Sequence, residues 1–464
     1  MTLYKGHRQN HQERRLLLAF AFCGLCFTSY ARSGQPEADP KTVPALLAPE
    51  KMREDLDYTV KILRNVHPAT YHGFSGEQQA VIDAAYHQIQ EPKAINAFYF
   101  IVNSVICSLQ DGHTNLRPRG DNQNRRIDVP IIWLRDGFYV QEDREPFQRG
   151  DRIVAIGGKG IDAIYQQMRA LIPAENEHYR KWGMAGKIQR EEFLDYMGVI
   201  ENDAVEIGIE RAGNGITLSA PLKPPVPRQP GQSSRPWVGY QIDADLSLGI
   251  FHLDTCNPND QYTKTLRAFF AEVSEKNIRN IAVDVRRNGG GNSRVIDEFF
   301  TYLKIGRYRS YGGDIRYSKE VAQKVGYTRT SGYERGRPHQ MRNDKVKDSK
   351  LLFDGKLFVL TSTQTFSSGN WFAVTVKDNG LGTIIGEPTG NAPSSYGDVP
   401  SFRTPNAGFW FSVSHKKFVR PNPDNDPEDA LYPDIPVYTT IDDVIHGSDP
   451  QIEKLKAIVK EGPK

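Results

Sequence analysis

The segment 356–386 constrains the fold of this chain more than any other part of its sequence. A β-rich run over Lys356–Thr361 ends in small polar residues, and Ser367 then opens a segment with helical apolar spacing that stops at Asn379. A second apolar run, Thr383–Gly386, follows directly. This order predicts a strand, a helix and a strand, with a serine at the helix N-terminus. Free amides and the positive dipole end stabilise an oxyanion there, so Ser367 is either a nucleophile or a simple helix cap.

Two further segments carry residue types that suit a nucleophilic serine. A buried strand is expected over Ile281–Val285, and it runs into the glycine triplet 289–291 before a helix from about Ser293. Glycines let the backbone approach a ligand closely and point its amides at a negative oxygen, although many αβ units turn on glycine for structural reasons alone. Upstream, the sequence DGHT at 111–114 follows an apolar helix expected over Phe98–Cys107.

Over roughly residues 48–460 the chain resembles the tail-specific or C-terminal-processing serine peptidases, in the branch that includes the tricorn core domain. Seven pieces occur in family order: VHP at 66–68, DGHT at 111–114, a PDZ-like GD-I-I-G over 150–157, VDVRRNGGGNS at 283–293, TFSSGNWFAVTVKDNG at 365–380, GEPTG at 386–390, and PDIPV at 433–437 with GSDPQIE at 447–453. The resemblance implies an α/β core of the ClpP/crotonase-like type, with an N-terminal helical domain and a PDZ-like β-rich domain. It also implies serine-peptidase chemistry, without identifying the substrate.

The base is where the chain departs from the better-known branch of that family. That branch carries a lysine about two dozen residues after the serine, and Ala392 stands at this position here. The tricorn-like branch uses a histidine from the N-terminal helical part instead, and His113 of DGHT occupies the corresponding place. A histidine in a short loop at a helix end can reach into a cleft, although a surface or capping role stays open. His415 is the alternative base, and His67 is expected to be structural.

The resemblance also points to the remaining members of the site. Glu428 lies near the position of the tricorn-like glutamate, where a carboxylate would hold the imidazole tautomer, although a solvated acidic turn explains it equally well. The backbone amides of Gly290 and Ser368 are the expected oxyanion hole. No His/Cys cluster has metal-ligand spacing, so neither a metal nor a cofactor is expected.

The chain of 464 residues is long enough for two or three domains with a sizeable core. The predicted parts are a signal peptide (1–31), a lead segment and N-terminal helical domain (32–124), a PDZ-like domain (125–225) and the peptidase αβ core (226–464). Within the PDZ-like domain a helical insert is expected over Pro173–Tyr196. Residues Gly306–Lys350 show no clear periodicity, which indicates either a flap over the active site or a solvated loop.

The N-terminus has the three regions of a secretory signal, with basic residues, a short apolar run and small residues before a cleavage site after Ala31. A retained N-terminal membrane anchor is the competing interpretation. Lys5, Arg8, Arg14 and Arg15 against Glu13 give this segment a net charge of +3, which equals the +3 of the whole chain. The mature protein is therefore near neutral, and its charge gives no reason to expect nucleic-acid binding.

Cysteine usage fits an exported chain without requiring a disulfide. Cys23 and Cys26 lie in the predicted signal, which leaves Cys107 and Cys256. These two can bridge in an oxidising compartment, but buried free thiols are the favoured expectation.

The expected function is that of a secreted or periplasmic serine-type peptidase that acts on peptides or proteins through an acyl-enzyme. No stable membrane insertion is expected after signal removal, and the oligomeric state is left open. Two alternatives remain: a non-peptide ester or amide hydrolase, because acyl chemistry is shared, and a catalytically silent peptide-binding protein.

Overall fold

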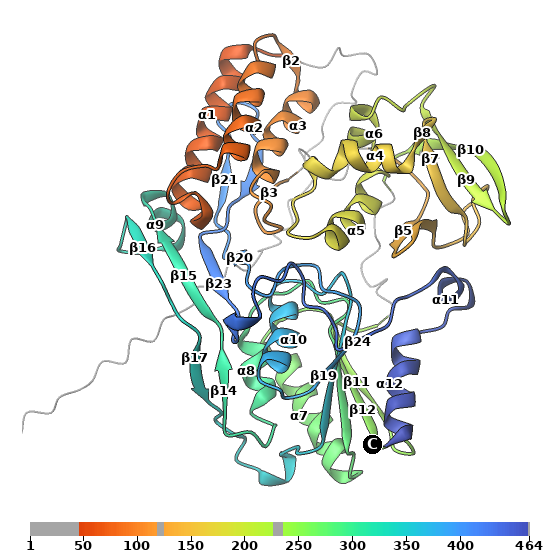
Figure 1. The fold of residues 1–464 in the computed structure, drawn as a ribbon, viewed down its shortest axis with the longest axis vertical. Coiled ribbons are helices and arrows are strands. Elements are labelled where there is room, and N and C mark those ends of the chain that lie inside the picture. Colours follow the sequence, from red (N-terminus) through yellow and green to blue (C-terminus); the bar gives the residue numbers. More distant parts are fainter. Residues whose placement is uncertain (1–45, 118–124, 226–234, 463–464) are drawn as a thin grey trace, which may run out of the picture. The chain divides into compact units, whose positions relative to one another are not determined.

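The computed structural model describes residues 46–117, 125–225 and 235–462, so the predicted signal peptide lies outside the described residues. The first part of the described chain is helical, with α1 (Pro49–Val66), α2 (Gly76–Gln88) and α3 (Ile95–Cys107) (Figure 1). Proline begins α1, where the missing amide hydrogen costs nothing, and a capping box between Ser75 and Gln78 begins α2. A one-turn helix (Pro68–Thr70) and the short strands β1 (Leu46–Leu47) and β2 (Lys93–Ala94) complete this region.

Residues 125–225 form a seven-stranded sheet with three helices. Strands lie in the order β4-β10-β9-β7-β6-β5, with β8 beside β7. Their bounds are β4 (Arg126–Ile127), β5 (Ile131–Leu134), β6 (Gly137–Val140), β7 (Arg152–Ile156), β8 (Lys159–Gly160), β9 (Ala204–Arg211) and β10 (Asn214–Lys223). In β9 the apolar residues Val205, Ile207 and Ile209 are buried in alternation with more exposed neighbours, as a one-sided sheet requires.

The helices of this region are α4 (Ile161–Met168), α5 (Glu177–Lys187) and α6 (Glu191–Tyr196), and a short 3-10 turn (Arg169–Leu171) follows α4. The insert expected over Pro173–Tyr196 is therefore two helices that start only at Glu177. Asn176 caps α5, because its side-chain oxygen accepts a 2.8 Å hydrogen bond from the Tyr179 amide. The residues before this cap form a connection that the site uses.

The core is a six-stranded sheet in the order β11-β12-β13-β18-β19-β24. The strands are β11 (Val238–Asp243), β12 (Leu248–Leu253), β13 (Asn280–Asp284), β18 (Lys356–Thr361), β19 (Thr383–Gly386) and β24 (Ile435–Pro436). Only β11 and β12 pair antiparallel, and the other neighbours are parallel. The carboxyl ends of β13 and β18 therefore meet at one edge, so the glycine turn after β13 and Ser367 after β18 emerge together.

Helices cover both faces of this core sheet, namely α7 (Asp260–Glu275), α8 (Arg294–Phe300) and α10 (Ser368–Asp378) on one face and α12 (Pro450–Glu461) on the other (Figure 1). Val359 packs in the cluster that contains Phe372 of α10, whereas its neighbour Leu360 packs in the cluster that contains Leu455 of α12. Successive strand residues thus pack on opposite faces of the sheet. Because both faces are buried, the strands are continuous apolar runs in the sequence.

The expectation of an irregular loop over Gly306–Lys350 is wrong. This segment contains β14 (Arg307–Ser310), β15 (Gly312–Tyr317), β16 (Gly332–Glu334), β17 (His339–Arg342), the helix α9 (Lys319–Val325) and a 3-10 turn (Ser349–Leu351). Strand β15 pairs with β23 (Lys416–Val419), about a hundred residues away in the chain. Such pairing leaves little local periodicity because the strands are short and only partly buried.

The short strand β3 (Asn115–Leu116), directly after the DGHT sequence, pairs with β22 (Trp410–Ser412), which also pairs with β21 (Ser401–Arg403). The remaining elements are β20 (Tyr396–Gly397), a 3-10 turn (Pro423–Asn425) and α11 (Ile441–His446). Residues 44–464 belong to one compact unit. The β3–β22 pairing therefore ties the histidine loop to the C-terminal half of the chain.

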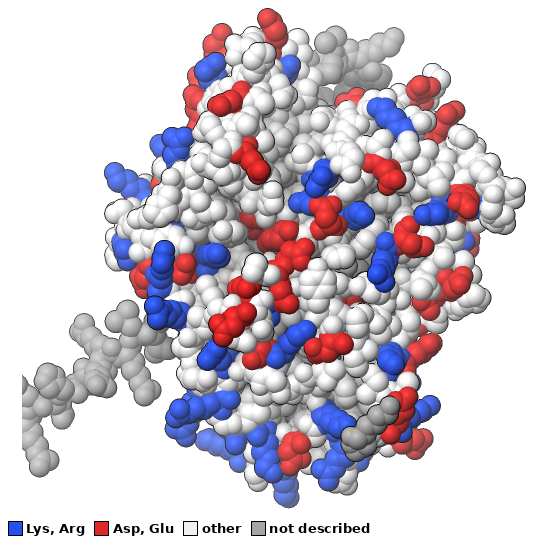
Figure 2. Space-filling view, in the orientation of Figure 1, with Lys and Arg blue, Asp and Glu red and all other residues white. Residues whose placement is uncertain are grey.

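Three global properties complete the description. Cys107 and Cys256 are both buried free thiols, as favoured from the sequence. No described helix combines the length and the apolar character that a membrane span needs. On the face drawn in Figure 2, acidic and basic side chains are interspersed, with basic ones gathered toward its lower end.

Candidate active site

Ser367 occupies the sharp turn between β18 and α10 in a backbone conformation that only glycine adopts freely. Its φ is 52° and its ψ is −127°, and the side chain is partly exposed. Such strain costs about 1–3 kcal/mol and persists only where neighbours hold the turn. The Ser367 amide donates to Oδ1 of Asn391 at 2.9 Å, and the Phe366 amide donates to the Asn288 carbonyl at 2.9 Å. This is the geometry of a nucleophile presented at the top of a sheet, and it is more than a helix cap requires.

The glycine turn after β13 lies directly against Ser367. A Cβ on Gly290, whose φ is +103°, would lie 2.5 Å from Cβ of Ser367, so only glycine fits there. The Gly290 amide donates to Oδ1 of Asn288 at 2.8 Å, whereas nothing in the described chain accepts the Ser368 amide. Of the two predicted oxyanion donors, the Ser368 amide is available and the Gly290 amide must first leave Asn288. Both roles stay predictions.

The DGHT loop is held by a buried aspartate. Asp111 is 0% exposed and accepts from the His113 amide at 2.9 Å through Oδ1. Its Oδ2 faces Nε2 of His67 at 3.2 Å and accepts from the hydroxyls of Thr114 and Ser414, each at 2.6 Å. Burial alone would raise the pKa of this carboxyl, but the His67 hydrogen bond and the neighbouring donors hold it well below the usual range. His67 is thus a structural partner of Asp111, as expected.

His113 is brought beside the serine turn without contacting the serine itself. Its ring centroid lies 4.6 Å from that of Phe366, the residue before Ser367. Within the described ranges, no hydrogen bond joins His113 to Oγ of Ser367, and the buried Nδ1 of His113 has no hydrogen-bond partner. Burial lowers the pKa of His113, although the negative charges of Asp111 and Asp398 act in the opposite direction and raise it. The imidazole is therefore kept neutral, as a general base must be.

Glu428 lies elsewhere. Its carboxylate binds the guanidinium of Arg420 at 2.5 Å, and Arg420 also binds Asp378 at 2.7 Å. Among the described residues no hydrogen bond or ion pair links Glu428 to His113. The structure thus gives Glu428 a partner that already satisfies it, and its catalytic role stays a prediction.

The sequence interpretation missed a carboxylate that does lie beside His113. Asp111, His113 and Glu175 each place one side-chain nitrogen or oxygen within 4.8 Å of those of the other two. Both carboxylate oxygens of Glu175 are buried and have no hydrogen-bond partner. Burial, and next the charge of Asp111, raise the pKa of Glu175 to about 8. No sequence motif marks Glu175; the only hint is that it precedes the α5 cap.

This triangle of groups also raises the question of a metal. The two oxygens of Asp111 already accept four hydrogen bonds from its neighbours, which fits an anchor for the loop. A ligand carboxylate would need a free lone pair directed at the ion. We therefore assign no metal or cofactor to this site.

The other predicted base positions are occupied or unsuitable. His415 is buried, its Nδ1 contacts the Asp398 carbonyl, and its Nε2 contacts the Tyr327 hydroxyl at 3.2 Å. Burial lowers its pKa to about 4. Ala392 provides no base at the lysine position, and Asn391 beside it holds the Ser367 amide instead.

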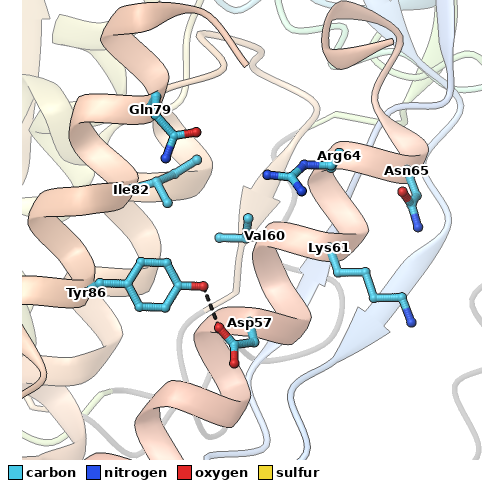
Figure 3. A pocket seen from close by; sticks show the side chains of 8 residues that line it. All are labelled: Asp57, Val60, Lys61, Arg64, Asn65, Gln79, Ile82 and Tyr86. Carbon is cyan, nitrogen blue, oxygen red and sulfur yellow. Dashed lines mark hydrogen bonds between the residues drawn. The ribbon is translucent and has the colours of Figure 1, made fainter. Parts of the chain in front are cut away.

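A separate pocket opens between α1 and α2 (Figure 3). It is lined by Asp57, Val60, Lys61, Arg64, Asn65, Gln79, Ile82 and Tyr86, and the Tyr86 hydroxyl donates to Asp57 at 2.5 Å. None of these residues belongs to the serine turn, the glycine turn or the DGHT loop. We assign it no part in the chemistry.

Known proteins resemble this chain in the sequence of its core and in fold over most of its length. Residues 247–437 match the model of peptidase family S41. The chain carries a peptidase family S41 domain. Its core has the S41 peptidase fold, and the match of residues 247–437 to this family supports a serine-type peptidase. No curated protein matches the whole sequence significantly.

Among solved structures, mature CPAF complexed with lactacystin resembles the S41 chain with a TM-score of 0.67 at 13% identity, over 89% of this chain and 98% of CPAF. The photosystem II D1 C-terminal processing protease matches with a TM-score of 0.43 at 15% identity, over 83% of this chain and 93% of that one. The CPAF likeness, at this identity, establishes a shared fold for nearly the whole described chain.

Proposed function

We propose that this S41 peptidase cleaves peptide bonds through an acyl-enzyme on Ser367, with His113 as the base, after export from the cytoplasm. One observation carries the proposal: Ser367 is held in a strained turn at the carboxyl edge of the core sheet, and the buried, unprotonated imidazole of His113 lies against the residue before it. A serine needs an adjacent base to react near neutral pH.

The reaction follows from these positions. His113 takes the hydroxyl proton as Oγ of Ser367 attacks the scissile carbonyl, and the resulting oxyanion binds the Ser368 amide. The C–N bond then breaks, and the leaving amine takes the proton from His113. Water, activated by the same imidazole, hydrolyses the ester and regenerates the serine. The absent Ser367–His113 hydrogen bond does not oppose this role, because such bonds are often long before substrate binds.

Reaction with a fluorophosphonate probe tests the nucleophile. Ser367→Ala should abolish labelling while the protein stays folded, because a single hydroxyl contributes little stability. Ser368→Ala keeps the amide that matters and should retain labelling. If Ser368→Ala abolishes labelling and Ser367→Ala does not, the nucleophile is misassigned.

Substitution of the histidines tests the base. His113→Ala should lower kcat/KM for a peptide by about three orders of magnitude or more, as loss of a triad member does elsewhere. The folded fraction of His415→Ala should retain its activity, because both ring nitrogens of His415 already contact Asp398 and Tyr327. If His113→Ala stays active and His415→Ala is inactive, His415 is the base and His113 is not. Turnover of a small ester with no turnover of any peptide would favour a non-peptide hydrolase.

A further inference from the structure

Glu175 is a buried acid without a side-chain partner among the described residues. Neither carboxylate oxygen makes a regular hydrogen bond, although the Gly112 amide and the charge of Arg180 favour its ionised form, and one oxygen lies within 4.8 Å of a ring nitrogen of His113. A Cβ built on Gly112 would meet Oε2 of Glu175 at 3.0 Å, so the carboxylate lies against the loop that carries His113. Leaving such a group unpaired costs about 1–3 kcal/mol or more, which calls for a functional explanation.

Several contacts hold the segment around Glu175 against the serine turn and against the loops that contain Thr389 and Asp429. The Asn176 side chain donates to the carbonyls of Thr389 at 3.3 Å and Asp429 at 2.8 Å. The Tyr179 ring stacks on Phe366, with centroids 4.8 Å apart and an interplanar angle of 18°. Phe366 thus lies between the rings of Tyr179 and His113. The start of α5 therefore packs against the candidate active site as well as against the β-rich region.

We propose that Glu175 is the positioning carboxylate of this peptidase, which binds Nδ1–H of His113 and leaves Nε2 free to take the proton of Ser367. The unpartnered Nδ1 of His113 and the unpartnered carboxylate supply the donor and the acceptor that such a bond needs. The proposal rests on the proposed roles of Ser367 and His113, and it makes Glu175 the third member of their catalytic triad.

The two competing carboxylates are committed elsewhere. Oδ1 of Asp111 lies 3.8 Å from Nδ1 of His113, but it already accepts the hydrogen bond of the His113 amide. Glu428 binds Arg420, whose side chain is 0% exposed. Moving Glu428 to His113 would leave part of that buried guanidinium uncompensated, which is strongly unfavourable. Glu175 has no ion pair to give up among the described residues. Its oxygens lie beyond hydrogen-bond length from His113 here, and the bond would form as substrate closes the site.

Two variants test the assignment on a peptide substrate. Glu175→Gln should lower kcat by about 10²- to 10⁴-fold with little change in KM, because the neutral amide cannot balance the imidazolium charge and can donate to Nδ1, which favours the wrong tautomer. Glu175→Asp should recover part of that loss. The melting temperature of Glu175→Gln should stay equal or rise, since a buried unpaired acid becomes neutral. A merely structural residue would lower stability and would not give this pattern.

The controls separate this inference from the proposed function. Glu177→Gln, an exposed neighbour on the same helix start, should keep kcat within about twofold of the parent chain. If Glu428→Gln loses activity while Glu175→Gln does not, Glu428 is the carboxylate and the inference fails. Activity lost with EDTA and restored by zinc would overturn it in favour of a metal site. If Ser367→Ala or His113→Ala stays active, the proposed function itself is wrong.

Discussion

If Ser367, His113 and Glu175 act as proposed, the protonation of Glu175 and His113 should set the pH range of activity. Burial and the charge of Asp111 raise the pKa of Glu175 to about 8, with Arg180 and the Gly112 amide opposing, whereas burial lowers that of His113. A protonated Glu175 donates to Nδ1 and forces the wrong imidazole tautomer. Activity should therefore rise with pH as Glu175 ionises, above the range of an ordinary histidine near ~6.5.

Profiles of kcat/KM against pH for a small ester, measured on the parent chain and on Glu175→Gln, check this expectation. The parent should show a rising limb near pH 8, the pKa of Glu175, and the variant should lack it. An identical limb at pH ~6–7 in both proteins would mean that only His113 titrates and that the protonation of Glu175 does not matter.

Asp111 makes the stability of the histidine loop depend on pH. Its folded-state pKa lies below the unfolded value, so its stabilisation is present above pH ~4 and is lost as the pH falls further. Asp111→Asn should cost about 3 kcal/mol of unfolding free energy at pH ~7, since buried donors lose their acceptor. Urea unfolding at several pH values tests this. A variant that loses as much stability as the parent on acidification would contradict it.

Sequence reasoning proposed Ser367 and His113 because each lies in a local pattern. Ser367 follows a strand and opens a helix, and His113 lies in a short loop with its own aspartate anchor. Glu175 was out of reach, because its proximity to His113 arises from tertiary packing of α5 on Phe366. Glu428 was proposed from a loose family alignment, which says nothing about its ion pair with Arg420.

At the scale of elements, the DGHT loop and the start of α5 leave no room for a side chain at Gly112. A Cβ there would meet Cζ of Phe366 at 2.9 Å and Oε2 of Glu175 at 3.0 Å. Gly112→Ala should displace these groups and lower kcat/KM about tenfold or more, with about 1–3 kcal/mol lost from unfolding. Gly186→Ala, where a Cβ meets nothing within 4 Å, is the matched control. Equal kinetics in both variants would show that the loop tolerates the displacement.

The core elements were predictable because their patterns are local. The expected runs Lys356–Thr361 and Thr383–Gly386 coincide with β18 and β19. The strands within 306–350 were missed because β15 is defined by its pairing with β23 and carries few buried residues. Strand β11 was missed as well.

At the scale of the whole chain, export predicts a shortened mature protein. The basic start, the apolar run and the small residues before Arg32 are typical of a cleaved signal. Mass spectrometry of the protein recovered from the periplasm or the medium should place its N-terminus at or near Arg32. A full-length product that stays in the cytoplasm would contradict the proposed export, and a full-length product in the membrane fraction would indicate a retained anchor.

The region 125–225 is proposed to hold peptide ends, as its PDZ-like turn suggests, but its deletion would not test this. The deletion would remove Glu175 and the contact of α5 with the serine turn, so turnover of every substrate would fall. The turn also touches the C-terminal segment, since a Cβ on Gly150 would lie 2.9 Å from Cδ1 of Ile445. A substitution at the surface of the turn is therefore the better test.

Arg149 is exposed at this turn, and its positive charge would attract a peptide carboxylate bound there. Arg149→Glu should raise KM about fivefold or more for a peptide with a free C-terminus, because a favourable charge becomes repulsive. The same peptide with an amidated C-terminus, and a small ester, should show little change. The matched control is Arg144→Glu, an exposed arginine in the preceding loop. Equal effects on both peptides would mean that the turn supports the core and does not recognise peptide ends.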